Sequence, residues 1–139
     1  MLWGEEKVGI LSSNSGLLLE KSMGYLWTKQ AAILDNIANA ETPNYKEKVV
    51  TFEESLRSRL QKAAGASRTP SRTAKAARKI LDAATVSVTE QQVATRMDEN
   101  GVNVTVQSAE AVRNAYQLRY VMSAINSDLS LLRSAVRGQ

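Results

Sequence analysis

The 139-residue sequence contains no cysteine and no histidine. Without cysteine the chain has neither a disulfide framework nor thiolate chemistry, and without histidine it lacks the usual zinc ligands and general bases. Its aspartates and glutamates form no recognisable paired acidic motif, so a hydrolase acting on the cell wall is poorly supported. These absences predict a protein that is not an enzyme and that binds no cofactor and no metal.

Aromatic residues are also scarce, at 5% of the chain, although 43% of the residues are hydrophobic. Much of the apolar content is alanine, valine and leucine, which suits seams between helices better than a large aromatic core. The length corresponds to one domain. No run approaches the roughly 20 apolar residues that span a bilayer. The first 19 residues lack a cleavable-signal layout, because Glu5, Glu6 and Lys7 stand where a basic region belongs. From these features alone, the expected location is the cytoplasm.

An apolar stripe with heptad spacing lies in the first third of the chain. Its members alternate spacings of four and three residues: Leu19, Met23, Leu26, Gln30, Ile33 and Ile37. Such a stripe predicts a helix, over residues 15–40, that buries one side against a partner helix. Trp27 and Leu34 widen this apolar face. Gln30, the polar member, either fixes the register of the pair or lies at the edge of the seam.

The predicted helix stops before a proline. Pro43 offers no N–H to continue the helix, and it moves Thr42 out of the α region. An extended turn carrying Asn44 and Tyr45 should follow. Tyr45 is expected to pack under this turn, with a contact between subunits as the second interpretation.

The last part of the chain carries the most regular pattern. Spacings of four and three alternate without a break through Ala111, Ala115, Leu118, Met122, Ile125, Leu129, Leu132 and Val136. They predict a helix over residues 106–136 that ends at Gly138. Glu110 near its start and Arg133 and Arg137 near its end suit the helix dipole.

The middle region is less regular. We expect a strand at residues 47–51, short helices at 51–64 and 73–84, and a loop with glycine, serine and proline between them. Residues 86–95 suit either strand or loop. The turn pair Asn100-Gly101 is compatible with a small hairpin joining residues 93–97 to 102–106.

Together these patterns predict a mainly α fold. Two long heptad helices, about 40 Å and 45 Å in length, form a coiled-coil hairpin. Residues 1–46 and 105–139 supply these helices, and residues 47–104 form a variable middle. Several large residues off the main stripes also need partners: Leu18, Trp27, Leu34, Tyr116, Tyr120 and Val121. Exposed apolar surface of this kind indicates an interface, here in a head-to-tail helical assembly.

A basic run is the main competing signal. No acidic residue lies between its first and last members. The run comprises Arg57, Arg59, Lys62, Arg68, Arg72, Lys75, Arg78 and Lys79. Such a run can bind phosphates, which would suit a helical nucleic-acid-binding or adaptor protein. The net charge is only +4, and no helix-turn-helix or base-stacking pattern accompanies the run. A solvated variable loop is therefore favoured, with an acidic neighbouring subunit as a third interpretation.

The string Asp35-Asn36-Ile37-Ala38-Asn39-Ala40-Glu41-Thr42-Pro43-Asn44-Tyr45-Lys46 resembles the N-terminal signature of bacterial flagellar rod and hook proteins. That signature reads roughly Asn-Ile-Ala-Asn-x-x-Thr-Pro-Gly-Tyr, and Asn44 stands in place of the glycine. Asparagine is the next most tolerant residue of left-handed backbone, so the turn should be preserved. Residues 52–56, 102–105 and 118–120 are most similar to the FlgB group of proximal rod proteins, with the FlgC group as the alternative. The resemblance covers about the first 60 and last 40 residues.

The resemblance implies a structural subunit of the proximal rod of the flagellar basal body. Its terminal helices would assemble, transmit torque and line the export channel. Implied partners are rod subunits of the FlgB and FlgC groups, the adaptor protein FliE, and proteins of the membrane ring and export gate, with no nucleic acid and no small-molecule substrate. Type III export without a cleaved signal would place it outside the cytoplasm. The candidate subunit interface comprises both heptad stripes with Trp27, Leu34, Asn36, Asn39, Pro43 and Tyr45. For Asn36 and Asn39 two interpretations stay open: hydrogen bonds to a neighbouring subunit, or a local cap at the end of the helix.

Overall fold

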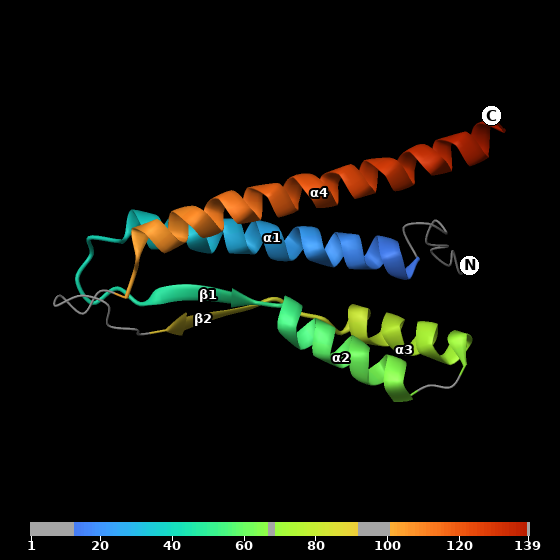
Figure 1. Cartoon of the computed structure of the whole chain (residues 1–139), viewed down its shortest axis with the longest axis horizontal. Helices are drawn as coiled ribbons and strands as arrows, with labels where there is room; N and C mark the ends of the chain where they lie inside the picture. The colour runs from blue at the N-terminus through green and yellow to red at the C-terminus, as the bar shows by residue number, and fades with distance from the viewer. Residues whose placement is uncertain (1–12, 67–68, 92–100, 139) are drawn as a thin grey trace, which may run out of the picture.

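The computed structural model describes residues 13–66, 69–91 and 101–138 (Figure 1). Its elements, in chain order, are α1 (Asn14–Ala38), β1 (Glu47–Thr51), α2 (Glu53–Ala66), α3 (Pro70–Asp82), β2 (Ser87–Gln91) and α4 (Val104–Arg137). The prediction of a mainly helical chain with a long helix near each end is confirmed. The strand at residues 47–51 is also confirmed.

α1 begins and ends where the local chemistry predicts. The Ser13 side chain caps the start by accepting a hydrogen bond from the Gly16 N–H at 3.0 Å. The helix stops at Ala38, and the chain turns through Asn44, which has φ 58°. Asn44 is the one non-glycine residue with positive φ in the described part of the chain. The expectation of a turn that needs a residue tolerant of left-handed backbone is confirmed.

The two strands form an antiparallel pair whose register runs from Glu47 opposite Gln91 to Thr51 opposite Ser87. The hairpin considered for residues 93–97 and 102–106 is wrong at its second arm. Asn103 caps α4 by accepting from the backbone N–H groups of Thr105 and Val106, so the valine alternation there becomes the first turn of a helix. Its first arm, 93–97, lies outside the described residues.

α1 is the central element (Figure 1). α4 lies along one side of it and runs in the opposite direction, while the strands and the α2–α3 pair lie on the other side. The core joins these layers through buried residues of α1, β1, α3 and α4 and of the adjoining segments, among them Tyr25, Leu26, Val50, Phe52, Leu81, Ala84 and Val121. The rings of Tyr25 and Phe52 stack with centroids 5.3 Å apart.

α2 and α3 contact each other and form a helical hairpin that lies beside the sheet and below α1 in Figure 1. α2 continues to Ala66, and α3 begins at Pro70, whose fixed φ suits the first helical turn. The expected loop at residues 65–73 is therefore much shorter. The basic run is not a solvated loop, since all of its members except Arg68, which lies outside the described residues, are on these two helices.

Candidate functional site: the helix pair of α1 and α4

The predicted stripe of α1 faces inward along its whole length. Leu26 and Ile33 are buried, and Leu19, Met23, Gln30 and Ile37 are half-buried. The flanking pair, Trp27 and Leu34, is exposed. The periodicity of α1 therefore identified its packing face correctly, because all but one of the residues there are apolar.

The predicted stripe of α4 is right at five of its eight positions. Ala111, Leu118, Ile125 and Leu132 are half-buried, as is Leu129, but Ala115, Met122 and Val136 are exposed. The fully buried positions are instead Gln107, Asn114 and Val121, seven residues apart. The apolar stripe begins after Gln107 and takes Ala115 in place of the polar Asn114. The same offset of one residue then selects Met122 in place of the buried Val121.

Asn114 joins the middle of the two helices. Its Nδ2 donates to the Leu26 carbonyl at 3.1 Å and to the Gln30 Oε1 at 2.8 Å, and the residue is 0% exposed. Gln30, which is half-buried, therefore bonds across the pair of helices. The sequence analysis missed Asn114, although its seven-residue spacing from Gln107 and Val121 was a usable signal.

Asn36 joins three elements at the end of α1. Its Nδ2 donates to the Lys48 carbonyl at 2.9 Å and to the Gln107 Oε1 at 3.2 Å. Its Oδ1 accepts from the Lys48 N–H at 2.9 Å and from the Tyr45 hydroxyl at 3.4 Å. Gln107 in turn donates to the Glu47 Oε1 at 2.6 Å. Asn36 is 1% exposed. These hydrogen bonds are all within one chain, and they hold β1 and α4 against α1.

The other candidate residues of the signature-like string, residues 35–46, are Asn39, Pro43 and Tyr45. The Asn39 Nδ2 donates to the Asp35 carbonyl at 2.9 Å, which is the cap interpretation. Tyr45 is half-buried under the turn, as expected, and burial raises the pKa of its hydroxyl; the charge of Lys48 opposes that shift and the charge of Asp35 adds to it. Pro43 is exposed.

Ion pairs flank the polar contacts. Lys29 of α1 lies 3.0 Å from Glu110 of α4, and Glu110 also pairs with Arg113. The hydrogen bond from Lys29 holds the pKa of the Glu110 carboxyl below its ordinary value, and the positive charges of Lys29 and Arg113 lower it further. On the other side of α1, Lys48 pairs with Asp35 at 2.7 Å, which raises the pKa of the lysine.

A second stripe runs along the exposed side of α1. It has spacings of three and four residues and is formed by Gly24, Trp27, Ala31, Leu34 and Ala38. Trp27 is 59% exposed and Leu34 55%. We call these five residues the outer stripe. α4 also exposes large apolar side chains, among them Val112, Tyr116, Tyr120, Met122, Leu131 and Val136.

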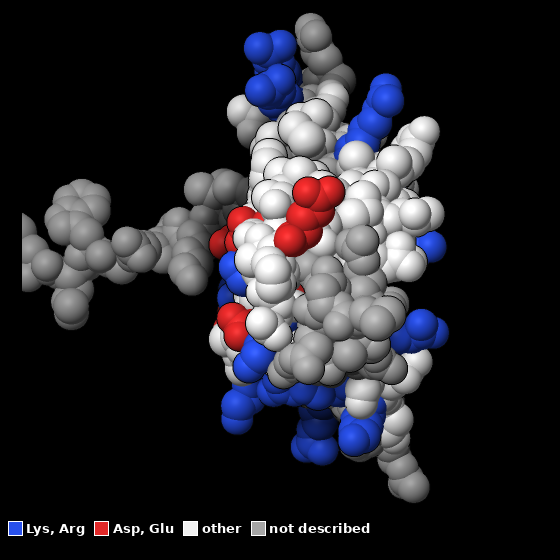
Figure 2. Space-filling model, turned by 90° about the vertical axis from the view of Figure 1, so that its left-hand side faces the viewer, with Lys and Arg blue, Asp and Glu red and all other residues white. Residues whose placement is uncertain are grey.

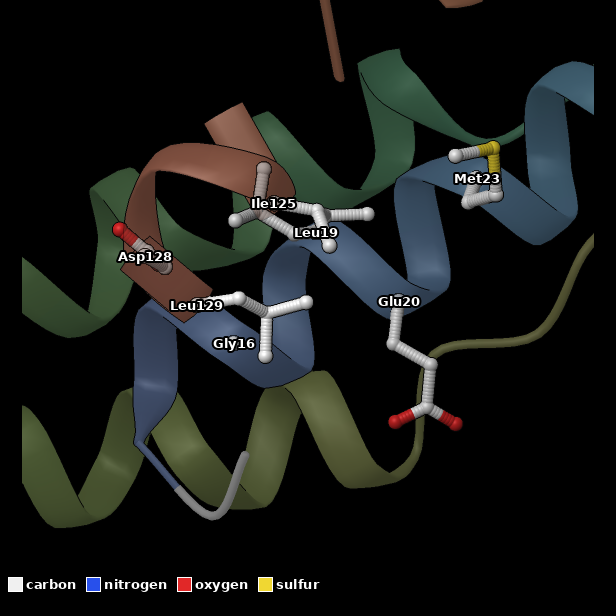
Figure 3. Close-up of a pocket in the computed structure, with 7 residues that line it drawn as sticks. All are labelled: Gly16, Leu19, Glu20, Met23, Ile125, Asp128 and Leu129. Carbon is white, nitrogen blue, oxygen red and sulfur yellow. The ribbon is translucent and has the colours of Figure 1, made fainter. Parts of the chain in front are cut away.

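The helix pair is open at the end where α1 starts. A cleft of about 390 Å³ lies there between the two helices, with Leu19 and Met23 on one wall and Ile125 and Leu129 on the other (Figure 3). Beyond Leu132 every described residue of α4 is exposed. Figure 1 shows this last part of α4 extending away from α1. Among the described residues, the apolar side chains at this end of the pair are therefore only partly covered.

Within the described ranges, no cluster of acidic side chains is placed to hold a metal ion. None of the described helices is long and apolar enough to cross a membrane. No family model and no curated protein matches the sequence. The function is therefore inferred from the helix pair and its surfaces.

Proposed function

We propose that this chain is a structural subunit of a helical assembly, of the type built by bacterial flagellar rod proteins. One observation carries the proposal: α1 packs on α4 through one heptad stripe and exposes a second, the outer stripe, on another side. In this proposal α1 and α4 form an antiparallel coiled-coil hairpin, and neighbouring subunits cover its outer surfaces.

The outer stripe has the form of a helix-packing surface. Gly24, Ala31 and Ala38 alternate with Trp27 and Leu34, so small residues leave hollows between large ones. A neighbouring helix can insert its side chains into such hollows, as in knobs-into-holes packing. The five residues also form one continuous apolar stripe on α1, and continuous exposed apolar surface of this kind is typical of a contact with another protein.

The exposed residues of α4 supply a second, different surface. Val112, Met122 and Val136 are exposed on α4, whereas the outer stripe belongs to α1. Contact between two different patches is heterologous, and repetition of such a contact produces a ring or an open helical assembly. An open assembly agrees with the tubular rod that the resemblance implies.

The turn after α1 supports the resemblance to the rod family. Asn44 occupies left-handed backbone at the position where the family signature has glycine. We therefore propose a FlgB-type proximal rod subunit, with a FlgC-type subunit as the alternative. On this proposal its partners are rod subunits, FliE and proteins of the membrane ring and export gate, and it reaches the basal body by type III export.

The test is complementation of a gene deletion with the double variant Trp27→Glu/Leu34→Glu. Two charges on the outer stripe should block assembly, so motility and basal bodies seen by electron microscopy should be lost while the circular dichroism of the purified chain is unchanged. Val88→Glu, at an exposed valine of β2, is the matched control. Intact flagella in the deletion strain would overturn the flagellar role, and normal assembly of the double variant would overturn the outer stripe as an interface.

A further inference from the structure

Among its described residues, the α2–α3 hairpin exposes six cationic side chains. Leu56 and Leu81 of the hairpin are buried. The exposed basic residues are Arg57, Arg59 and Lys62 of α2 and Arg72, Lys75 and Lys79 of α3. We call these six residues the basic face. Figure 2 shows Lys and Arg side chains gathered at the lower end of the molecule, where Figure 1 places the hairpin.

The acidic residues of the hairpin stand only at its two ends, with Glu53 and Glu54 in the first turn of α2. From Leu56 to Leu81 the sequence contains no aspartate or glutamate. Asp82 follows, but it pairs with Arg78, which is not part of the basic face, at 3.8 Å. Arg72, Lys75 and Lys79 are three and four residues apart and so form one row on α3. Repulsion within such a row destabilises the free hairpin, so a polyanionic partner would be bound favourably.

The surroundings of the basic face indicate which polyanion fits. The sequence has no aromatic residue between Phe52 and Tyr116, and Phe52 is buried. Binding of single-stranded nucleic acid relies on stacking of bases on aromatic side chains, which this face cannot offer. The two helices instead present long, flexible side chains on an extended surface. Clusters of four to eight Lys and Arg on a helix are typical of proteins that bind anionic lipid headgroups.

We propose that the basic face docks the α2–α3 hairpin on the surface of a bilayer rich in anionic phospholipid. The arginines donate paired N–H bonds to headgroup phosphates, and the lysines act as point charges. Because Leu81 and Ala84 of this region are buried in the core, the hairpin does not insert into the bilayer. Binding is therefore electrostatic, and salt weakens it.

This docking is independent of the proposed assembly. The α2–α3 hairpin lies on the side of α1 opposite α4 (Figure 1). A subunit can therefore rest on a membrane while α4 and the outer stripe contact other subunits.

The experiment is co-sedimentation of the full chain with phosphatidylglycerol–phosphatidylcholine vesicles, with pure phosphatidylcholine vesicles as the reference. Binding is expected only to the anionic vesicles and should be lost at high salt. Arg72→Gln/Lys75→Gln/Lys79→Gln should lower the partition coefficient on the order of 100-fold. The charge-matched control is Arg119→Gln/Arg133→Gln/Arg137→Gln, at three exposed arginines of α4. Its binding should fall much less.

Circular dichroism of both variants establishes that each is folded. Absence of binding to anionic vesicles would overturn the proposal, and so would an equal loss in both variants, which would reflect net charge alone. Displacement of the chain from vesicles by a duplex oligonucleotide at lower concentration than free anionic lipid would assign the basic face to nucleic acid instead.

Discussion

Asn114 of α4 donates a hydrogen bond to Gln30 of α1 at 2.8 Å, inside an interface whose other positions are mostly apolar. Asn114 is fully buried, and its Oδ1 has no hydrogen-bond partner in the described part of the chain. Sliding one helix along the other would leave both amides against apolar side chains, which costs more than the aligned state. The pair therefore fixes the alignment of the helices at some cost in stability.

We expect Asn114→Ala to lower the free energy of unfolding by about 1–3 kcal/mol, because the Gln30 carbonyl and a new cavity are left in the interface. Urea denaturation followed by circular dichroism measures the change. Asn126→Ala, at an exposed position of the same helix, should change stability by less than about 0.5 kcal/mol. Replacement of both Asn114 and Gln30 by leucine should recover most of the loss. Equal effects of the two alanine variants would contradict the buried role.

Asn36→Ala should lower the free energy of unfolding more than Asn39→Ala does, although both residues belong to the string at residues 35–46 that resembles the rod-protein signature. Asn36 makes four hydrogen bonds to Lys48, Gln107 and Tyr45, whereas the Asn39 amide bonds locally to the end of its own helix. Removal of the Asn36 amide leaves buried partners unpaired, so we expect a loss of about 2–4 kcal/mol, against about 1 kcal/mol for the cap. Thermal unfolding of both variants under one set of conditions gives the comparison.

These polar contacts also explain which parts of the structure could be predicted. The packing face of α1 follows from its sequence because only Gln30 interrupts the apolar stripe. The face of α4 was shifted because Gln107 and Asn114 occupy buried positions that an apolar pattern passes over, and the same offset then missed Val121. The hydrogen bonds that make these amides suitable for burial come from α1 and β1, so the pattern within α4 does not reveal them.

The pairing of β1 with β2 is a second case. Residues 47–51 read correctly as a strand, but their partner lies about 40 positions along the chain, after two helices. The turn signal at Asn100-Gly101 suggested a nearer partner instead. The Asn44 turn, by contrast, depends on the neighbouring Pro43 and on the residue's own backbone preference, so the sequence was sufficient to predict it.

The left-handed conformation of Asn44 predicts opposite effects for two substitutions there. Asn44→Gly should be tolerated within about 0.5 kcal/mol, because glycine adopts positive φ without strain. Asn44→Val should cost about 1–2 kcal/mol, because its Cβ and branched side chain disfavour this region. Melting temperatures of the two variants test this. A valine variant as stable as the glycine variant would mean that the turn readily adopts another conformation.

Glu110 predicts a loss of stability in acid. Contacts with Lys29 and Arg113 hold the pKa of Glu110 below its ordinary value of 4.5 in the folded chain. A carboxyl with a depressed pKa stabilises the fold fully above its unfolded pKa, and this contribution is lost as the pH falls through the folded pKa. Glu110→Gln should therefore be less stable than the parent at pH 7, and the difference should shrink toward pH 3. Urea titrations at both pH values measure it, with Glu20→Gln, exposed on α1, as the control.

Amide hydrogen exchange of the dilute chain should divide α4 into two parts. Residues 107–121 include the positions buried on α1, so their amides should exchange slowly. Residues 133–137 are exposed on every side, and Val136 is 83% exposed, so the last turns should fray and exchange fast. If neighbouring subunits complete the helix pair, assembly should add protection at residues 133–137 and along the outer stripe, while peptides of β2 serve as the internal reference. Uniform slow exchange along α4 in the dilute chain would instead indicate a self-sufficient bundle, whose end needs no neighbour.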